Sequence, residues 1–577
     1  MSLLTVVVGS AVVLAIAYVT YGRLLAKMFN LDASRPTPAV ELRDDIDYQP
    51  LKASSLLPQH FSAIAAAGPI VGPIAAGLMF GWLPALIWIL IGSIFIGGVH
   101  DFTALVASIR HKARSIAEVV NEHVSRLSYL MFLAFIWIAL VYIVVAFTDV
   151  TAGSFVGAAQ EANGNVPGAA IAGSSLLYLI LPIVMGLVVR FAKIPMGTAV
   201  LCAIPLVVVA ILVGKYMPID LQAWLGLASA GEARKAWSVI LLLYCLVAGV
   251  VPVWLLLQPR GELGGYFLYA ALGIGAIGLI VGGGTIQYPA FRGWSVENAT
   301  GTQTLFPFLF ITIACGACSG FHSLIASGTT SKQLKKETDA KVVGYGTMLL
   351  EAMVAIVSLC CVMSFAPGST ELKGDPNQVY AQGIGNFANA IGIPREAAIT
   401  FALLAFTTFV YDTLDVCTRL GRFIIQELTG MHNWVGKTIG TVLTAGVPIF
   451  FMLRHPSDAP PLFRTFWSLF GASNQLLAAL TLLGVTVWLW KTKRVWWVWL
   501  VVGVPTVWMY TMSVWALSLM TLPKLFGQNR PSFMADPVPY VGLTLLLMAL
   551  VMLFEAIRVI FFSTPVAPSM PTAKAVA

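Results

Sequence analysis

The chain has 577 residues, of which 58% are hydrophobic and only 10% are charged, whereas about 25% of residues are charged in a typical soluble domain. This composition excludes a large soluble domain and predicts an all-α polytopic membrane protein. The formal net charge of +8 comes from basic residues scattered among short polar segments. We therefore interpret the charge as a guide to membrane topology and expect no nucleic-acid partner.

About fifteen apolar segments are long enough to cross a bilayer as helices. The first has no basic residue before it and is followed by Arg23 and Lys27, so we predict a retained helix with its N-terminus outside. Fifteen crossings then place the C-terminus in the cytoplasm, and most basic residues fall in the predicted cytoplasmic loops. The spans are predicted near 3–22, 62–79, 82–105, 127–148, 170–189, 196–214, 237–257, 266–286, 304–326, 342–366, 398–417, 435–453, 464–490, 495–520 and 539–562.

The second span is interrupted where a helix should be continuous. Proline removes an amide donor and glycine adds backbone freedom, so the segment AGPIVGP is predicted to unwind. A helix that restarts near Gly72 would turn its amide donors toward a carboxylate. Inside a bilayer, freed backbone groups are tolerated only where they are buried in protein or line a watery cavity. We therefore predict that this segment binds the substrate through Ala67, Gly68, Pro69, Gly72 and Pro73.

The order of the spans predicts an inverted repeat. Five spans over 62–214 begin inside, and the next five, over 237–417, therefore begin outside, so the two sets have opposite orientations in the membrane. Gly249 and Pro252 predict that the second set also opens with an interrupted helix that contributes to the substrate site, although Pro252 could instead kink a packed helix. The remaining parts are an N-terminal helix with a cytoplasmic loop, 1–61, and additional C-terminal helices, 435–562.

Polar side chains at membrane depth are costly enough to suggest a role in ion coupling. Ser319, His322 and Ser323 share one face of a helix, and histidine can carry a proton near neutral pH; the alternative is close packing through small hydroxyl residues. Glu351 lies near the middle of its span, as either a coupling carboxylate or a hydrogen-bonded structural acid. Asp412 has no evident local partner in the sequence and is a further candidate for coupling.

Two further polar pairs lie in the apolar segments. His100 and Asp101 close the span 82–105 near its predicted cytoplasmic edge, where they serve either as a gate or as a helix-end anchor. Asn474 and Gln475 lie near mid-membrane but outside the ten-helix core, and we expect them to form hydrogen bonds between helices.

The seven cysteines all fall in apolar segments. Cys315 and Cys318 have a spacing found in redox and metal motifs, but no second pair accompanies them, so we interpret them as small packing residues. We predict no disulfide framework, no metal site and no cofactor beyond a coupling ion, H⁺ or Na⁺.

Several long segments of the chain resemble the carbon starvation protein A (CstA) family. The similarity extends from about residue 55 to 515 and rests on HFSAIAAAGPIVGPIAAGLMFGWLPALIWILIGSIFIGGVHDF, VPVWLLLQPRGEL, LFPFLFITIACGACSGFHSLIASGTTSKQLKKETDAKVVGYGTMLLEAMVAI, DTLDVCTRLGRFIIQEL and WSLFGASNQLLAAL. This resemblance implies an inverted five-plus-five helix core of the LeuT/APC-like type. It also implies inner-membrane uptake of peptides or pyruvate, coupled to protons. The loop 367–397 and the C-terminal tail are shorter than in long family members.

Three classes of function are compatible with the spans alone. The leading hypothesis is a secondary transporter that takes up a small carboxylate or a peptide by alternating access. A passive channel is the first alternative. An intramembrane redox or enzyme subunit is the second, and it is weakly supported because single histidines such as His100 and His322 do not make a pattern of haem ligands. We therefore predict a transporter rather than an enzyme; the identity of the substrate and the oligomeric state stay open.

Overall fold

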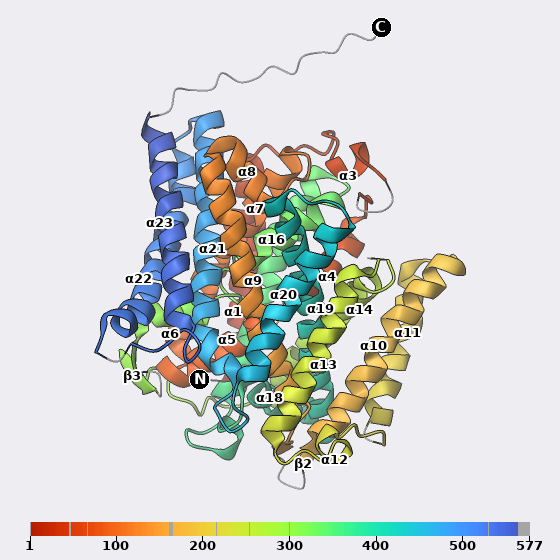
Figure 1. Cartoon of the computed structure of the whole chain (residues 1–577). Helices are drawn as coiled ribbons and strands as arrows, with labels where there is room; N and C mark the ends of the chain where they lie inside the picture. Colours follow the sequence, from red (N-terminus) through yellow and green to blue (C-terminus); the bar gives the residue numbers. More distant parts are fainter. Residues whose placement is uncertain are drawn as a thin grey trace.

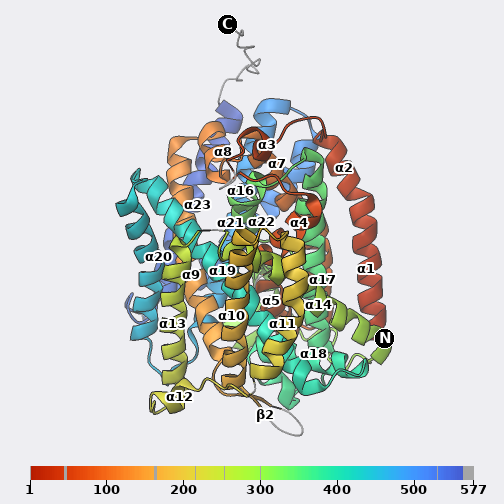
Figure 2. The ribbon, with the colours of Figure 1, turned by 90° about the vertical axis from the view of Figure 1, so that its right-hand side faces the viewer.

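The computed structural model describes residues 2–44, 48–65, 67–160, 165–214, 216–252, 254–298, 301–528 and 530–562. Over these residues, long helices run roughly along one direction and form a single bundle (Figures 1 and 2). The strands named in this part of the chain form two short antiparallel hairpins, in which β1 (Ala158–Gln160) pairs with β2 (Asn165–Pro167) and β3 (Ser295–Asn298) pairs with β4 (Gly301–Thr304).

Thirteen helical segments of the described chain are long and apolar enough to cross a membrane, and one bent helix pair counts as a fourteenth. The chain is therefore a multi-pass membrane protein. The thirteen segments are α1–α2 (Leu3–Val19, Tyr21–Met28), α6–η1–α7 (Trp82–Gly92, Ser93–Gly97, Gly98–Arg110), α9 (Arg126–Ser154), α10 (Gly168–Phe191), α11 (Met196–Gly214), α13 (Ala230–Val250), α14 (Leu257–Gly282), η3–η4–α17 (Glu337–Asp339, Lys341–Gly346, Thr347–Met363), α19 (Arg395–Thr429), α20 (Trp434–Arg454), α21 (Leu462–Lys493), η6–α22 (Trp499–Gly503, Val504–Phe526) and α23 (Val538–Phe562).

The predicted total of fifteen spans stays a prediction. The predicted span that is not among the fourteen is 304–326. It is occupied by two helices of eight residues each, α15 (Leu305–Thr312) and α16 (Phe321–Gly328).

Short helices mark the two ends of the bundle. One end, which we call the α8 end, carries α3 (Pro38–Glu41) and α8 (Ile116–His123), and the opposite α12 end carries α12 (Leu221–Trp224) and the N-terminus (Figure 1). Ser115 caps α8 by accepting a hydrogen bond from the amide of Glu118, at the spacing of a capping box. The other short elements are η2 (Thr330–Lys332), η5 (Thr370–Leu372) and α18 (Pro376–Ala390).

The predicted interruption of the second span is confirmed, but its extent is not. α4 (Ala53–Ile64) and α5 (Gly68–Phe80) meet at a bend of 46°. The break precedes Gly68, and α5 continues through Gly72 and Pro73, so the predicted unwinding of those two residues and the restart near Gly72 are wrong. Pro69 lies in the first helical turn, where a missing amide donor costs nothing, and Pro73 removes only one helical hydrogen bond.

The second interrupted helix lies elsewhere than predicted. α13 ends at Val250 and α14 begins at Leu257, so Gly249 closes one helix and Pro252 lies in the turn between two separate helices. The predicted break inside a span at this point is therefore wrong. The interrupted span is α15–α16, whose connecting segment 313–320 is not α-helical.

The two broken helices pack directly against each other. A β-carbon on Gly72 would lie 2.6 Å from the carbonyl oxygen of Thr312, at the end of α15. Such an approach of backbone to backbone leaves room only for glycine. The crossing of α5 with segment 313–320 therefore forms a tightly packed centre, and α21, whose apolar part is wholly buried, runs beside it.

Candidate functional site

Four ionisable side chains form a buried group beside the second broken helix. We call it the histidine–carboxylate cluster: His100 and Asp101 from α7, His322 from α16 and Glu351 from α17. All four are 0% exposed. The two oxygens of Asp101 lie 2.7 Å from Nδ1 of His100 and 2.7 Å from Nδ1 of His322. On the other side of the His322 ring, Nε2 lies 3.2 Å from Oε2 of Glu351.

The contact of Glu351 with His322 is close but lacks hydrogen-bond geometry, and neither carboxyl oxygen of Glu351 has a hydrogen-bond partner among the described residues. A buried carboxylate without donors is costly unless it is neutral or faces a positive charge. The cluster can thus hold a proton in two ways, either on the His322 ring between two carboxylates or on Glu351 beside a neutral ring. Both arrangements hold the same single proton, and its release would leave the carboxylates of Asp101 and Glu351 beside a neutral His322 ring, so the cluster is a candidate site for loading and releasing one proton.

The structure joins residues that were predicted separately. His322 and Glu351 were predicted as coupling residues, and His100 with Asp101 as a gate or an anchor at the cytoplasmic edge of a span. The edge position is wrong, because α7 continues to Arg110 and the pair lies near the start of that helix, fully buried. Asp101 contacts His322 of α16, which in turn contacts Glu351 of α17, so the pair belongs to the same group.

Ser319 and Ser323 face α21 rather than an open path. The predicted shared helix face is wrong for Ser319, because α16 begins only at Phe321. Ser319 Oγ and Asn474 Nδ2 lie 3.0 Å apart, and Asn474 Oδ1 also accepts a hydrogen bond of 2.9 Å from the Phe321 amide. Ser323 Oγ donates to the Gly320 carbonyl and contacts a threonine hydroxyl of α21. The predicted interhelical hydrogen bonding of Asn474 is confirmed.

A second buried ionic group surrounds Arg260, which is 0% exposed on α14. Its guanidinium donates to Asp412 Oδ1 at 3.2 Å and pairs with Asp415, while Ser62 from α4 donates to Asp412 Oδ2 at 2.6 Å. The predicted coupling residue Asp412 thus has partners that are distant in sequence. Arg260 was missed because the hydropathy pattern placed it in a loop before the span 266–286, whereas α14 begins at Leu257.

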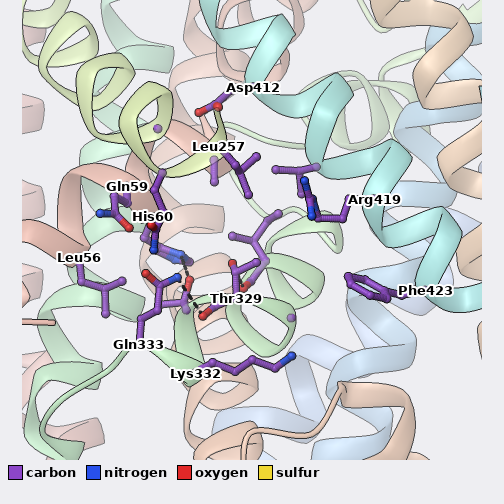
Figure 3. A pocket seen from close by; sticks show the side chains of 17 residues that line it. Leu56, Gln59, His60, Leu257, Thr329, Lys332, Gln333, Asp412, Arg419 and Phe423 are labelled. Atoms are coloured by element: carbon purple, nitrogen blue, oxygen red, sulfur yellow. Dashed lines mark hydrogen bonds between the residues drawn. The ribbon is translucent and has the colours of Figure 1, made fainter. Parts of the chain in front are cut away.

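A cavity of about 110 Å³ opens between α4, α14, α16 and α19, next to the Arg260 group (Figure 3). Asp412 lies at one side of the cavity, and Lys332 and Arg419 supply positive charge to its wall. His60 lines it as well, with Nδ1 2.8 Å from the hydroxyl of Thr330 and with no partner for Nε2 among the described residues.

The predicted substrate-binding residues do not line this cavity. Those of the first broken helix are buried at the crossing of the two interruptions. Gly249 accepts a hydrogen bond of 2.6 Å from Arg422 through its carbonyl group, and Pro252 lies in the turn that follows. Contact of any of them with a substrate stays a prediction; the residues are Ala67, Gly68, Pro69, Gly72, Pro73, Gly249 and Pro252.

Comparison with known proteins gives strong matches over most of the sequence. The family model described as carbon starvation protein CstA matches residues 2–372 and 368–516. The pyruvate/proton symporter BtsT of Escherichia coli K12 is 32% identical, over 92% of this chain and 82% of that protein. The peptide transporter CstA of Campylobacter jejuni is 30% identical, over 94% and 83%, and that of Helicobacter pylori 26695 is 31% identical, over 85% and 78%.

Among solved structures, the similarity is much weaker. A mutant of the manganese transporter of Eremococcus coleocola aligns over 90% of this chain and 99% of its own, with 14% identity and a TM-score of 0.46. A score below 0.5 does not establish a common fold.

Proposed function

The chain belongs to the carbon starvation protein CstA family, and from this premise we propose that it is a secondary transporter of the bacterial inner membrane that carries pyruvate or peptides together with protons. The relatives carry the names of a pyruvate/proton symporter and of peptide transporters. The histidine–carboxylate cluster is the observation that supports proton coupling most directly.

Coupling requires that the proton and the substrate influence the same conformational equilibrium. The cluster holds α7, α16 and α17 together through groups that gain or lose a proton, so its protonation changes the contacts between these helices. His60 lines the cavity from α4, Ile325 lines it from α16, the helix that carries His322, and Asp412 links the cavity to the Arg260 group. A proton that enters the cluster would therefore alter the electrostatics of the cavity wall.

The cavity favours pyruvate as the substrate in this conformation. Its volume of about 110 Å³ is well below the roughly 300–1,000 Å³ of pockets that hold drug-sized ligands. Lys332 and Arg419 offer positive charge to a small carboxylate. A peptide is the second candidate, and it is supported by the names of the relatives from C. jejuni and H. pylori.

We assign the α8 end to the cytoplasm. Loops at this end carry clusters of basic residues, including Lys112, Arg114, Lys335 and Lys336, as the positive-inside rule requires of cytoplasmic loops. The N-terminus then lies outside, as predicted, because α1 begins at the α12 end. In this orientation the cavity lies toward the cytoplasmic side of the bundle.

We also propose a five-plus-five inverted core, with boundaries other than 62–214 and 237–417. Each set of five would open with a broken helix, because such helices build the substrate site in transporters of this architecture. The pair α10–α11, which lies at the edge of the bundle (Figures 1 and 2), would be an insertion. The first set is then α4/α5, α6–α7, α9, α13 and α14, and the second is α15/α16, α17, α19, α20 and α21.

Uptake into proteoliposomes tests the function. With the outside acidic relative to the inside, the reconstituted protein should accumulate labelled pyruvate above the external concentration, and a protonophore should abolish the accumulation. Equilibration without accumulation would instead indicate a passive channel. Excess unlabelled peptide should compete only weakly; strong competition, together with direct uptake of labelled peptide, would favour the peptide as the substrate.

A further inference from the structure

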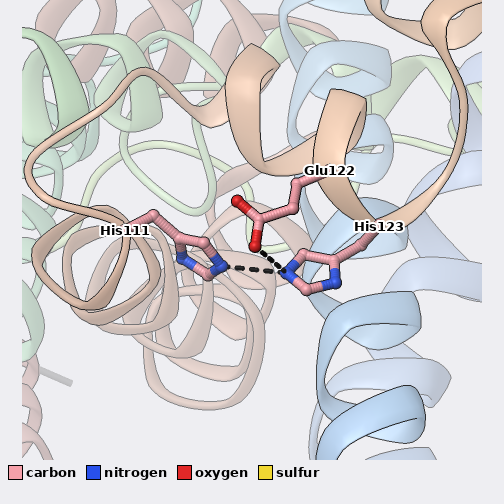
Figure 4. A group of neighbouring side chains, drawn as sticks. All are labelled: His111, Glu122 and His123. Atoms are coloured by element: carbon pink, nitrogen blue, oxygen red, sulfur yellow. Dashed lines mark hydrogen bonds and ion pairs between the residues drawn. The ribbon is translucent and has the colours of Figure 1, made fainter. Parts of the chain in front are cut away.

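Three side chains at the α8 end point toward one another (Figure 4), and they are not among the residues that line the cavity. His111 terminates α7, while Glu122 and His123 end α8. The two Nε2 atoms lie 2.9 Å apart, and Oε1 of Glu122 lies 3.9 Å from Nε2 of His123. One donor atom from each of the three residues lies within 4.8 Å of the other two.

We propose that His111, Glu122 and His123 bind a divalent transition-metal ion of the zinc class. Two imidazole nitrogens and one carboxylate oxygen are a common set of protein ligands for such an ion, and water completes the tetrahedral coordination. Sequence patterns did not reveal the set, because His111 and His123 are far apart for a helical motif and meet only through the turn between α7 and α8.

The orientation of His111 favours a metal over a simple contact between rings. Its Nδ1 donates a hydrogen bond of 2.6 Å to the carbonyl of Ala107, which leaves the lone pair of Nε2 directed at His123. A backbone acceptor on the far nitrogen is the usual support of a metal-binding histidine. Tetrahedral coordination at metal–nitrogen distances of about 2.0–2.1 Å separates two nitrogens by roughly 3.3 Å, so the rings need to open only slightly from their present 2.9 Å.

The surroundings set the charge and the access of the site. Glu122 is 56% exposed, so an ion can enter from the aqueous side. The ammonium group of Lys491 from α21 donates to the carbonyl of His123 at 3.2 Å and opposes a cation, whereas the carboxylate of Glu122 favours one.

A bound ion would brace the end of α7 against α8. The same α7 carries Asp101 of the histidine–carboxylate cluster. Metal binding at this junction therefore restrains a helix that the proposed coupling mechanism uses. The binding site itself does not depend on the transport function and is tested separately from it.

Titration of the purified full-length protein in detergent, with any affinity tag removed and with resident metals stripped by a chelator, tests the proposal. Zn²⁺ should bind with a stoichiometry of about one per chain in calorimetry, and Co²⁺ should give the visible absorption of a tetrahedral nitrogen–oxygen site. His111→Gln and His123→Gln should each weaken Zn²⁺ binding more than tenfold and abolish the Co²⁺ spectrum. Glu122→Gln, at an exposed position that tolerates substitution, should also weaken binding measurably.

Two histidines distant from this site in the sequence provide matched controls. His432→Gln and His455→Gln should retain the wild-type affinity and spectrum. Equal affinity for Zn²⁺ in the wild type and the monodisperse Glu122→Gln and His111→Gln variants would overturn the proposal. The absence of saturable binding in the wild type would overturn it as well and would leave a hydrogen bond between the two rings.

Discussion

Gly68 and Cys315 meet where the two broken helices cross: a β-carbon on Gly68 would collide with both Sγ and Cβ of Cys315. Gly68 begins α5, and Cys315 lies in the non-helical segment 313–320 of the other interrupted helix. The two interruptions can therefore pack this closely because Gly68 has no side chain. A movement of α5 relative to α15 and α16 would change this contact.

We predict that Gly68→Ala lowers both transport and thermal stability, because an extra methyl group in a packed interior typically costs about 1–3 kcal/mol. Uptake in proteoliposomes and the melting temperature in detergent provide the two readouts. Gly273→Ala is the matched control, since a β-carbon there meets nothing within 4 Å. Adding Cys315→Gly should restore part of both losses, because the nearest clashing atoms are then removed. Wild-type behaviour of Gly68→Ala would contradict this account of the crossing.

Local signals explain which parts of the fold could be predicted. Hydropathy identified nearly all of the long helices, and glycine with proline located the break before Gly68, because these residues act on the backbone directly. The break between α15 and α16 carries no proline. Its shape depends on Asn474 of α21, which accepts from the Phe321 amide through its side chain and from the Gly320 amide through its carbonyl. Contacts so distant in sequence leave no local pattern.

The site could be predicted residue by residue but not as an arrangement. Membrane depth identified His322, Glu351 and Asp412, because a polar group in an apolar span is unusual. The neighbours of these residues depend on how α7, α14, α16 and α17 pack, which a single sequence does not reveal. For the same reason Arg260 looked like a loop residue, although it pairs with Asp412 in the interior.

We predict that Glu351→Gln uncouples transport from the proton gradient. The amide cannot exchange a proton, so accumulation driven by the gradient should fall at least tenfold, while exchange of labelled for unlabelled substrate across the membrane should be largely retained. Glu555→Gln is a suitable control, since Glu555 is a mostly buried acid on α23 that pairs with Arg558 outside the cluster. Equal loss of accumulation and exchange would assign Glu351 a structural role instead.

Arg260→Met should destabilise the protein strongly. Removing one member of a buried ion pair leaves an uncompensated charge and typically costs about 3–5 kcal/mol, and here both Asp412 and Asp415 lose their partner. Melting of the purified protein measures the effect. Adding Asp412→Asn and Asp415→Asn should recover much of the loss because the unpaired charges disappear.

The exposed pair of Lys524 with Asp536 serves as the control: Lys524→Met should lower the free energy of unfolding by less than about 1 kcal/mol. A small effect of Arg260→Met would show that water reaches the group.

Charged side chains line a second cavity, of about 310 Å³, at the α12 end of the bundle. Arg234 of α13 donates to Asp149 of α9 at 2.8 Å and lies 3.8 Å from Asp375, which precedes α18. Asp149 also accepts a hydrogen bond of 2.9 Å from the Phe463 amide at the start of α21. Four segments are therefore tied together at this end by charged side chains that also line the second cavity.

We predict that Arg234→Met shifts the protein toward a conformation that is more open at the α12 end, because Arg234 joins α13 to Asp149 of α9 and to Asp375. A loss of about 1.4 kcal/mol changes the ratio of the two conformations tenfold. A cysteine at position 59, in the cavity wall, reports the shift. The background is Cys202→Ser, which removes the exposed native thiol. In this background, Gln59→Cys should react more slowly with a thiol reagent when Arg234 is replaced.

Lys235→Met is the neighbouring control, since Lys235 donates to a backbone carbonyl at an exposed position, and this change should leave the rate unchanged. An unchanged or faster reaction in Arg234→Met would show that these charges do not hold the α12 end closed.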